Sequence, residues 1–344
     1  MHEKNLDKTL KELRPPSGGP WGGNYVDENY IKWMTEFFGE ATMKQFKDEC
    51  IDDFIDMLRE FEIRKRNVFP DTQGFVVFKI SPNLQNCHNE SEDENILTRI
   101  ARLNLGNGVK IKKDKLHVSV DIVRSWFKEP IDNAVGHVKS ILSEPAMKDI
   151  CTILLVGGFG ECQLVQEAVR KAAGTRTVLT PEDAGLAVLK GAVQFGHQPR
   201  MITSRCMKYT YGFLTQCQFD ERKHPLEKMA IDSYGEKKVY GCFEKIVSRG
   251  ESVDMCKEVK FEQYVVDKGK FSTLSLYSST KQDPEFTNDP TCTLIGKIDL
   301  PIPPGDTKEE NSTNIYFTFG DTELKASVEY LKTGQVLTKV IDCL

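Results

Sequence analysis

The chain has 344 residues, of which 39% are hydrophobic and 28% charged, and its formal net charge is −5. This length allows two domains with a core in each, and the composition is that of a soluble globular protein. The acidic balance gives no electrostatic reason to expect nucleic acid as a partner, and no apolar run approaches the roughly eighteen residues of a membrane span.

Ten cysteines are scattered along the chain without a CxxC pair. In so long a chain this spacing predicts no disulfide framework, and a zinc site would need clustered cysteine and histidine. We therefore expect reduced thiols, no bound metal and a cytoplasmic location. The polar, acidic N-terminal segment does not have the pattern of a signal peptide.

Two helices are predicted after the glycine-rich segment GGPWGG, residues 18–23. The first is amphipathic and stops at Gly39. The second is charged, covers residues 42–67 and has one apolar face. Both patterns are typical of helices that pack one face onto a core.

Strands are predicted over residues 74–80 and 115–121, separated by a polar stretch that turns into a short helix or an irregular segment. Asp121 is expected to cap the next helix, which Pro130 would break or kink. Alternation of this kind indicates an α/β layer.

The stretch ILLVGGFGECQLVQEAV, residues 153–169, predicts a buried strand, a glycine turn and a helix that Gly174 ends. PEDAGLAVLKGAVQFG, residues 181–196, predicts one more helix with Pro181 and two acids near its start. Residues 199–205 are then predicted to form a linker.

Strand patterns dominate from residue 206 to the end. Apolar residues alternate on both sides of Gly320-Asp321, which predicts a β-hairpin. We interpret residues 206–344 as an antiparallel β-sandwich and residues 1–198 as an α/β domain, so that the whole chain is an α+β multidomain protein.

Two glycine patterns could bring a ligand close to the backbone. Gly157 and Gly158 lie between a strand and a helix, where the free N–H groups of the helix favour a phosphate or a ribose. The same pair could make only a tight turn. GGPWGG also precedes a helix, but it has neither the Lys nor the Ser/Thr of a P-loop.

Glu62, Lys65 and Arg66 form a third candidate, because residues three and four apart share one face of a helix. They could bracket an adenine and its ribose by hydrogen bonds and stacking, or they could be a solvated helix face. The six histidines stand apart and no GxSxG or HExxH pattern occurs. We therefore assign no catalytic residue.

Taken together, these motifs resemble one family. SGGPWGGNYVDENYIKWM, FEIRKRNVF and ILLVGGFGECQLVQEAV resemble the second lobe of the actin-like ATPase domain of heat shock 70 kDa chaperones. The forms GGxWGG, FExxKR and LVGGF are those of the divergent 12A/12B branch. The resemblance covers nearly the whole chain, and the C-terminal strands look like the end of that family's peptide-binding β-sandwich.

The resemblance implies a site for ATP or ADP, with Mg²⁺ bound only through the nucleotide. Glu62, Lys65 and Arg66 match the residues of the family that contact adenosine. Gly157 and Gly158 match the glycine pair beside the phosphate and the ribose.

Three further residues match the family and three depart from it, one of them Phe69, which replaces a Ser on the adenine side. Glu182 matches an acid near the adenosine pocket, and Gly22 and Gly23 match the glycines that open a helix beyond a phosphate loop. Phe159 stands where the common chaperones have a Ser that helps to hold the nucleotide, and Glu161 where they have an Arg that stacks on the adenine. Losing that stacking would weaken binding by about tenfold or more, unless Phe159 and Phe69 stack instead.

The family also grips the phosphates and Mg²⁺ with loops of the DxGTT and DxGGGT kind, neither of which occurs in this sequence. We therefore expect a truncated form or a fragment that binds ATP or ADP weakly, or only with first-lobe elements. Hydrolysis by this chain alone is not expected, since phosphoryl transfer depends on positioning and charge stabilisation by such loops.

For the β-sandwich, the resemblance implies a chaperone-related stress-response protein that binds unfolded or extended peptides and co-chaperones. Phe213 and Phe261 are the candidates for its substrate pocket, although both could be ordinary inward positions of the sandwich. The alternative function is a non-catalytic recognition or scaffold module that keeps the fold without nucleotide turnover.

Overall fold

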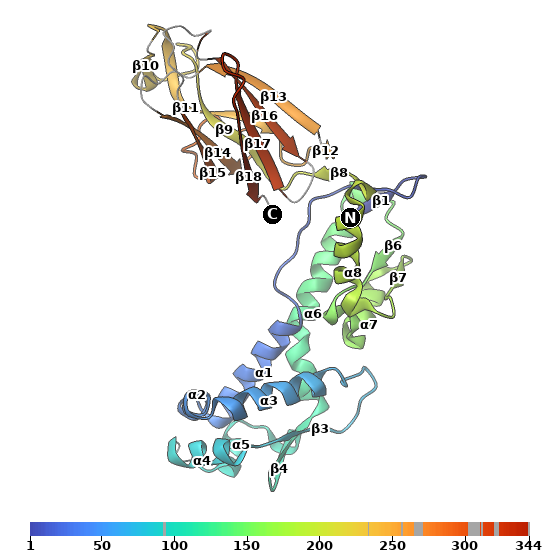
Figure 1. The fold of residues 1–344 in the computed structure, drawn as a ribbon. Coiled ribbons are helices and arrows are strands. Elements are labelled where there is room, and N and C mark those ends of the chain that lie inside the picture. Colours follow the sequence, from blue (N-terminus) through green and yellow to red (C-terminus); the bar gives the residue numbers. More distant parts are fainter. Residues whose placement is uncertain are drawn as a thin grey trace. The chain divides into compact units, whose positions relative to one another are not determined.

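The computed structural model of the protein describes residues 1–91, 94–232, 234–255, 257–264, 271–301, 310, 312–319 and 323–342 (Figure 1). The chain divides into two compact units, Gly18–Val193 and Met1–Ser17 with Gln194–Leu344, which are described separately. Both helices and several sheets are present, which confirms a mixed α and β protein. Within the described ranges, no helix is both long and apolar enough to cross a lipid bilayer.

The first half of the unit Gly18–Val193 is mostly helical. Its helices are α1 (Gly23–Phe38), α2 (Glu40–Glu49), α3 (Ile51–Lys65), α4 (Pro82–Ser91) and α5 (Ile96–Arg102). Helix α1 ends before Gly39, as predicted. The single helix predicted over 42–67 is wrong, because Cys50 leaves helical geometry (φ −126°, ψ 50°) and separates α2 from α3. This break lets α2 pack on α4 while α3 packs on α1 and the neighbouring strand.

A three-stranded antiparallel sheet packs against α3, in the order β3 (Phe75–Lys79), β5 (Lys115–Ser119), β4 (Val109–Lys112). Strands β3 and β5 confirm the two predicted strands. The core between sheet and helices is aromatic: the rings of Tyr30 and Phe61 stack at 3.9 Å, and Trp126 packs edge-on against both. This core fixes the C-terminal end of α3, where the candidate polar cluster lies.

Helix α6 (Val120–Leu142) runs beside α1 (Figure 1). Its N-cap is Ser119, whose hydroxyl accepts a hydrogen bond from the N–H of Ile122, so the predicted cap at Asp121 is wrong by two residues. The helix also continues through Pro130 without a break. Proline frees the carbonyl four residues earlier, and the side chain of Asn29 donates a 2.8 Å hydrogen bond to that carbonyl, of Trp126.

The second half of this unit contains the glycine turn. Parallel strands β6 (Thr152–Leu154) and β7 (Thr177–Leu179) pair with each other, and β7 is absent from the sequence prediction. The turn continues as a short 3-10 helix, Gly158–Glu161, and then as α7 (Gln163–Ala173), which ends at Gly174 as predicted. Helix α8 (Ala184–His197) follows β7.

The unit Met1–Ser17 with Gln194–Leu344 begins with a small sheet. Its order is β1 (His2–Lys4), β2 (Leu10–Glu12), β8 (Ile202–Cys206), β12 (Ser252–Asp254), and β2 runs parallel to β8. The first residues of the chain therefore pack with the strand-rich unit, whereas the sequence analysis placed them in the α/β domain. Residues 202–205 of the predicted linker form most of β8.

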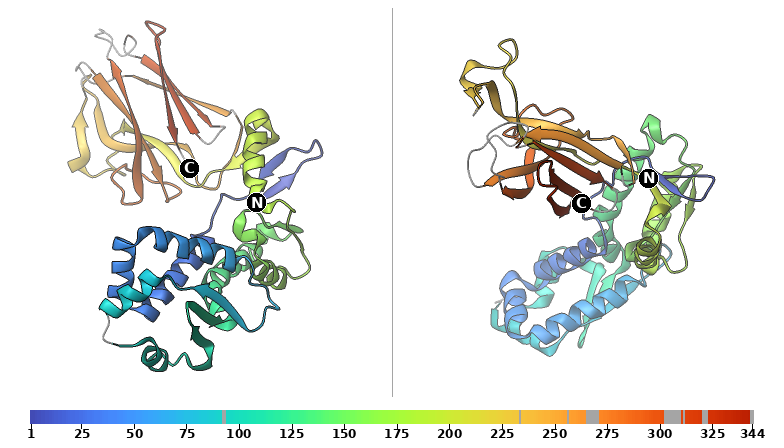
Figure 2. Two further views of the ribbon diagram at one scale, coloured as in Figure 1. Left: turned by 60° about the horizontal axis from the view of Figure 1, so that its bottom comes forward. Right: turned by 45° about the horizontal axis from the view of Figure 1, so that its top comes forward.

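Two antiparallel sheets face each other in the rest of this unit (Figure 2). The first has the order β10 (Met229–Ile231), β11 (Lys237–Val247), β9 (Thr210–Gln218), β14 (Phe271–Ser279), β15 (Cys292–Pro301). The second has the order β13 (Lys257–Tyr264), β16 (Ser312–Phe319), β17 (Glu323–Tyr330), β18 (Val336–Asp342). Strands β16 and β17 pair antiparallel as predicted, while the Gly320-Asp321 turn lies outside the described residues.

One expectation about the cysteines is wrong. Cys217 on β9 and Cys242 on β11 form a disulfide, with their Cα atoms 6.3 Å apart. Reduced thiols were predicted, because the spacing of the cysteines shows no disulfide framework. The two strands are neighbours in the sheet, so it is strand pairing that brings the two cysteines together.

Candidate functional site

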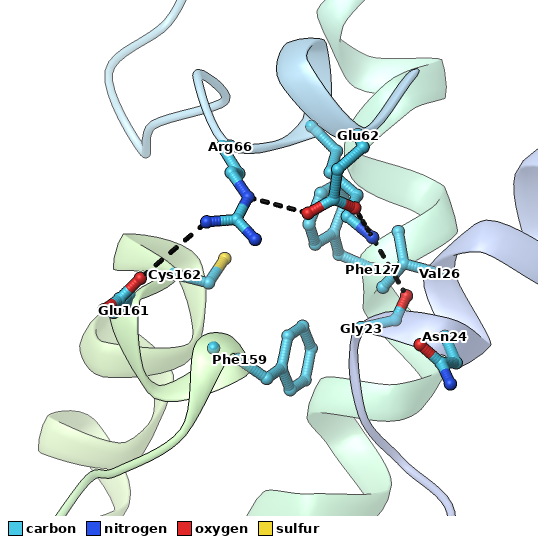
Figure 3. A pocket seen from close by; sticks show the side chains of 11 residues that line it. Gly23, Asn24, Val26, Glu62, Arg66, Phe127, Phe159, Glu161 and Cys162 are labelled. Carbon is cyan, nitrogen blue, oxygen red and sulfur yellow. Dashed lines mark hydrogen bonds and ion pairs between the residues drawn. The ribbon is translucent and has the colours of Figure 1, made fainter. Parts of the chain in front are cut away.

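A pocket of about 410 Å³ opens within the unit Gly18–Val193, between α1, α3, α6 and the turn after β6 (Figure 3). Its size falls in the range of small-molecule sites. The pocket is lined by residues from these four elements: Gly23, Asn24, Val26, Glu62, Lys65, Arg66, Phe127, Gly158, Phe159, Glu161 and Cys162.

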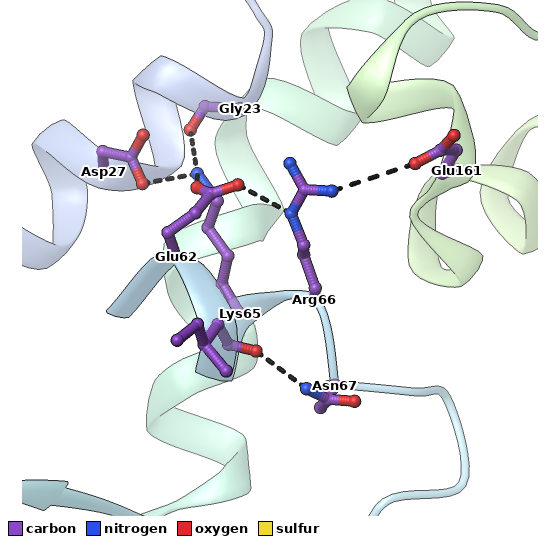
Figure 4. Close-up of polar contacts among 8 residues, drawn as sticks. Gly23, Asp27, Glu62, Lys65, Arg66, Asn67 and Glu161 are labelled. Carbon is purple, nitrogen blue, oxygen red and sulfur yellow. Dashed lines mark hydrogen bonds and ion pairs between the residues drawn. The ribbon is translucent and has the colours of Figure 1, made fainter. Parts of the chain in front are cut away.

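The last turn of α3 supplies the charged wall of the pocket (Figure 4). The Nζ atom of Lys65 lies 2.5 Å from Oε2 of Glu62 and 2.6 Å from Oδ1 of Asp27 on α1. The Nε atom of Arg66 donates a 2.7 Å hydrogen bond to Oε1 of Glu62. The three charged residues of FExxKR thus form one hydrogen-bonded cluster, because their spacing places them on one helix face.

These contacts set the charge states of the wall. Burial raises the pKa of Glu62, but the hydrogen bonds from Lys65 and Arg66 lower it by more, so the net pKa is below the ordinary value. The hydrogen bond to Glu62 raises the pKa of Arg66. The Lys65 side chain is 11% exposed whereas that of Arg66 is 63% exposed, so Arg66 is the cation that a ligand can reach.

The opposite wall is the glycine turn. Gly157 has φ of +79°, a conformation that other residues rarely adopt, and its N–H donates a 2.7 Å hydrogen bond to the carbonyl of Ala184. A Cβ atom at Gly158 would meet no atom within 4 Å. Because Gly158 also lines the pocket, its backbone is open to a ligand there.

Phe159 and Glu161 complete this wall. The ring of Phe159 packs partly against the aromatic core and also lines the pocket. The Oε1 atom of Glu161 accepts a 2.7 Å hydrogen bond from the N–H of Gly185 at the start of α8, and its Oε2 atom lies 4.0 Å from Nη1 of Arg66. In Figure 3, Arg66 and Phe159 reach into the pocket from different walls.

Burial raises the pKa of Cys162, the residue directly after this turn, whose side chain also lines the pocket. Figure 3 shows its sulfur on the same side of the opening as Arg66. The thiol is therefore mostly protonated at neutral pH, and it is in a position to report whether the pocket is filled.

The structure brings most of the predicted cofactor residues to one place. Seven of the residues proposed from sequence line the pocket: Gly23, Glu62, Lys65, Arg66, Gly158, Phe159 and Glu161. Three others lie outside its lining: Gly22 is the N-cap of α1, Gly157 forms the turn, and Glu182 is exposed before α8. Their roles toward a ligand stay predictions.

The two candidates of the β-sandwich lie in the other unit. Phe213 is fully buried, and its ring centroid lies 5.5 Å from that of Phe317 and 5.2 Å from that of Phe261. Phe261 is partly buried against the same core. Both therefore occupy inward positions of the sandwich, and their role in peptide binding stays a prediction.

Sequence reasoning missed four residues that line the pocket, Asn24, Val26, Phe127 and Cys162, and also Asp27, which pairs with the lining residue Lys65. Asp27 follows Gly23 by four positions on α1, so helical spacing alone places it on the face of that glycine. Phe127 belongs to α6, and no local pattern of the sequence links it to the glycine turn.

No family model matches the chain. The chain is 30% identical over 341 residues to heat shock 70 kDa protein 12A of Homo sapiens and to that of Mus musculus, an alignment that covers 97% of the chain and 50% of each relative. It is 28% identical over 347 residues to heat shock 70 kDa protein 12B of Homo sapiens, covering 98% of the chain and 50% of the relative. The chain thus spans about half the length of the curated relatives it matches.

Proposed function

We propose, from the premise that this chain is a relative of the heat shock 70 kDa proteins 12A and 12B, that its pocket binds the adenosine part of ATP or ADP. Similarity along nearly the whole chain confirms the family that the motifs predicted. The same proposal includes a partial actin-like ATPase fold and weak binding of ATP or ADP.

One observation carries the proposal. Three motifs that are far apart in the sequence, at Gly23, at Glu62–Arg66 and at Gly158, meet around one pocket within a single compact unit. Together the motifs supply three features that favour binding of a nucleoside: an approachable backbone, charged groups that form hydrogen bonds, and a flat group for stacking.

Different pocket residues can contact different parts of the nucleoside. Glu62 is ionised at neutral pH and can accept hydrogen bonds from ribose hydroxyls. The exposed guanidinium of Arg66 and the ring of Phe159 can stack on the adenine. Gly158 leaves room for the ligand beside the backbone. Nucleotide, when bound, would bring its own Mg²⁺, and the proposal assigns no hydrolytic step to these residues.

The test is a calorimetric titration of adenosine, ADP and ATP with Mg²⁺ against the full chain. We expect Glu62→Ala to weaken binding by about tenfold, because a hydrogen bond to a charged group is worth about 1.5–3 kcal/mol. Gly158→Val should abolish binding without loss of fold, because its side chain would fill open space.

Asp56→Ala is the matched control for Glu62→Ala. Asp56 is an exposed acid on the same helix that pairs across the surface with Arg59, and its loss should leave binding unchanged. Absence of heat for all three ligands with the wild-type chain would overturn the proposal, and so would equal binding by Gly158→Val.

The relationship also supports a proposal for the β-sandwich: binding of extended peptides, with co-chaperones, in a chaperone-related cytoplasmic role. Because Phe213 is fully buried, a peptide would have to contact other residues of this unit. Suppression of the aggregation of an unfolded client protein by the wild-type chain would support peptide binding. Its absence, with nucleotide binding retained, would favour the recognition or scaffold module.

A further inference from the structure

We infer that Glu161 makes this pocket select the uncharged nucleoside end of its ligand and disfavour phosphate groups. The inference rests on the proposed function and adds to it a preference between ligands: adenosine should bind at least as tightly as ATP. It follows from the balance and the placement of the charges around the pocket.

The cations of this pocket are already paired with carboxylates. Among the pocket-lining residues of the described chain, Lys65 and Arg66 are the cations and Glu62 and Glu161 are the carboxylates; Asp27, which lies outside the lining, also pairs with Lys65. Lys65 is held by two of these carboxylates at 2.5 and 2.6 Å, and Arg66 by one at 2.7 Å. A phosphate would have to compete with a carboxylate for either cation, and it would be repelled by the remaining acid.

Hydrogen bonds hold Glu161 in its position at the pocket. Its Oε1 atom accepts the 2.7 Å hydrogen bond from Gly185, and Gln166 donates hydrogen bonds of 3.0 and 3.2 Å to the carbonyls of Gly160 and Glu161. A Cβ at position 185 would lie 2.8 Å from Oε1 of Glu161, so a glycine there allows this close approach. The second oxygen, Oε2, is left near Arg66, at 4.0 Å.

The same arrangement favours binding of an uncharged nucleoside. Its hydroxyl and amino groups are donors, and ionised carboxylates only accept hydrogen bonds. The plane of the Arg66 guanidinium remains available for stacking while its edge is hydrogen-bonded to Glu62. A phosphate is also attracted by the N-terminus of α1, where Gly22 provides no side-chain cap, and such an attraction is weak at an exposed helix end.

The experiment titrates adenosine, ADP and ATP, each with Mg²⁺, against the full wild-type chain and against Glu161→Gln. The glutamine keeps an oxygen that can accept the hydrogen bond from Gly185 while the negative charge is lost. We expect wild-type affinity to be equal for the three ligands or highest for adenosine. In the variant, ATP should bind about three- to tenfold more tightly, with adenosine changed less than about twofold.

Glu167→Gln is the matched control, because it removes the same charge from α7, where Glu167 pairs with Lys171 outside the pocket lining. It should leave the affinity for ATP unchanged. Wild-type binding of ATP at least about tenfold tighter than adenosine would overturn the inference and leave the proposed site intact, as would an unchanged ATP-to-adenosine ratio in Glu161→Gln. If no ligand binds the wild-type chain, the proposed function itself fails and this inference fails with it.

Discussion

The dipeptide Gly-Phe occurs in both units at a candidate binding position, and its surroundings differ. At Gly158-Phe159 a Cβ on the glycine would meet no atom within 4 Å, and the phenylalanine lines an open pocket. At Gly212-Phe213 a Cβ would lie 2.2 Å from the ring of Phe243, and the phenylalanine is fully buried. One glycine leaves space for a ligand, whereas the other lets a neighbouring ring pack closely.

The difference arises from elements that are distant in the sequence. Phe243 belongs to β11, which pairs with β9 and places its ring over Gly212. No equivalent ring covers the turn at Gly158 among the described residues, and the surrounding helices leave a pocket there. A glycine next to an aromatic residue is therefore informative about ligand binding only when its neighbours across the fold are known.

Phe213→Ala should produce the largest effect that this comparison predicts. Truncating a fully buried phenylalanine costs about 3–5 kcal/mol of the free energy of unfolding, through lost burial and the cavity that remains. Hydrogen exchange of amides in β9 and β16 measures this loss. Leu214→Ala, at the next position of β9 and 37% exposed, should cost less than about 1 kcal/mol. A stable Phe213→Ala variant that has lost peptide binding would contradict the core assignment.

The two glycines should respond differently to the same substitution. Gly212→Ala should destabilise the sandwich by about 1–3 kcal/mol, because the added methyl group overlaps the ring of Phe243. Gly158→Ala should change the stability of its own unit by less than about 1 kcal/mol, since the methyl group meets open space. Thermal unfolding of both variants checks the pair, and equal destabilisation would remove the distinction drawn between them.

Lys65 and Arg66 offer a second contrast inside the pocket. Lys65→Ala would leave Glu62 and Asp27 without their buried partner, which we expect to cost about 1–3 kcal/mol of stability. Arg66→Ala removes a largely exposed cation, so it should cost less than about 1 kcal/mol of stability. It should nevertheless weaken adenosine binding more than Lys65→Ala does. All three tryptophans lie in the unit Gly18–Val193, so their fluorescence in urea reports this unit alone.

The pH dependence supplies the smallest predicted effect. The pKa of Glu62 is lowered in the folded chain, so its contribution to stability is present above the ordinary glutamate pKa of about 4.3 and is lost as pH falls through the lowered pKa. Because the side chain is 41% exposed, the contribution should be below about 1 kcal/mol. The free energy of unfolding, measured in urea between pH 6 and pH 3, should therefore fall slightly less steeply in Glu62→Gln than in the wild-type chain. A steeper fall in the variant would contradict the assigned direction.

Local signals in the sequence predicted the ends of helices well. Gly39 and Gly174 end α1 and α7 as expected, because a helix stop is a property of the residue itself. The break at Cys50 was missed, and the break that Pro130 could have caused does not occur. Both depend on tertiary partners: the packing of α2 on α4, and the hydrogen bond from Asn29 to the carbonyl that proline frees.

The candidate site was predicted in part for the same reason. Glu62, Lys65 and Arg66 were found because helical spacing alone puts them on one face. The sequence could not reveal that Asp27 pairs with Lys65 or that Glu161 binds the start of α8, since these contacts join separate elements. A local sequence pattern also could not show that Phe213 is buried in the core of the sandwich.

The most direct test of the central claim is site-resolved alkylation of the cysteines with iodoacetamide, read by mass spectrometry with and without adenosine. Cys162 lines the pocket, and because burial raises its pKa the reaction is best run at mildly alkaline pH. Cys151 is exposed in the same unit, outside the pocket lining, and serves as the internal control. We predict that adenosine slows alkylation of Cys162 in proportion to the occupancy of the pocket and leaves Cys151 unchanged. Alkylation of Cys162 at the same rate with saturating adenosine would contradict the claim that this pocket holds a nucleoside.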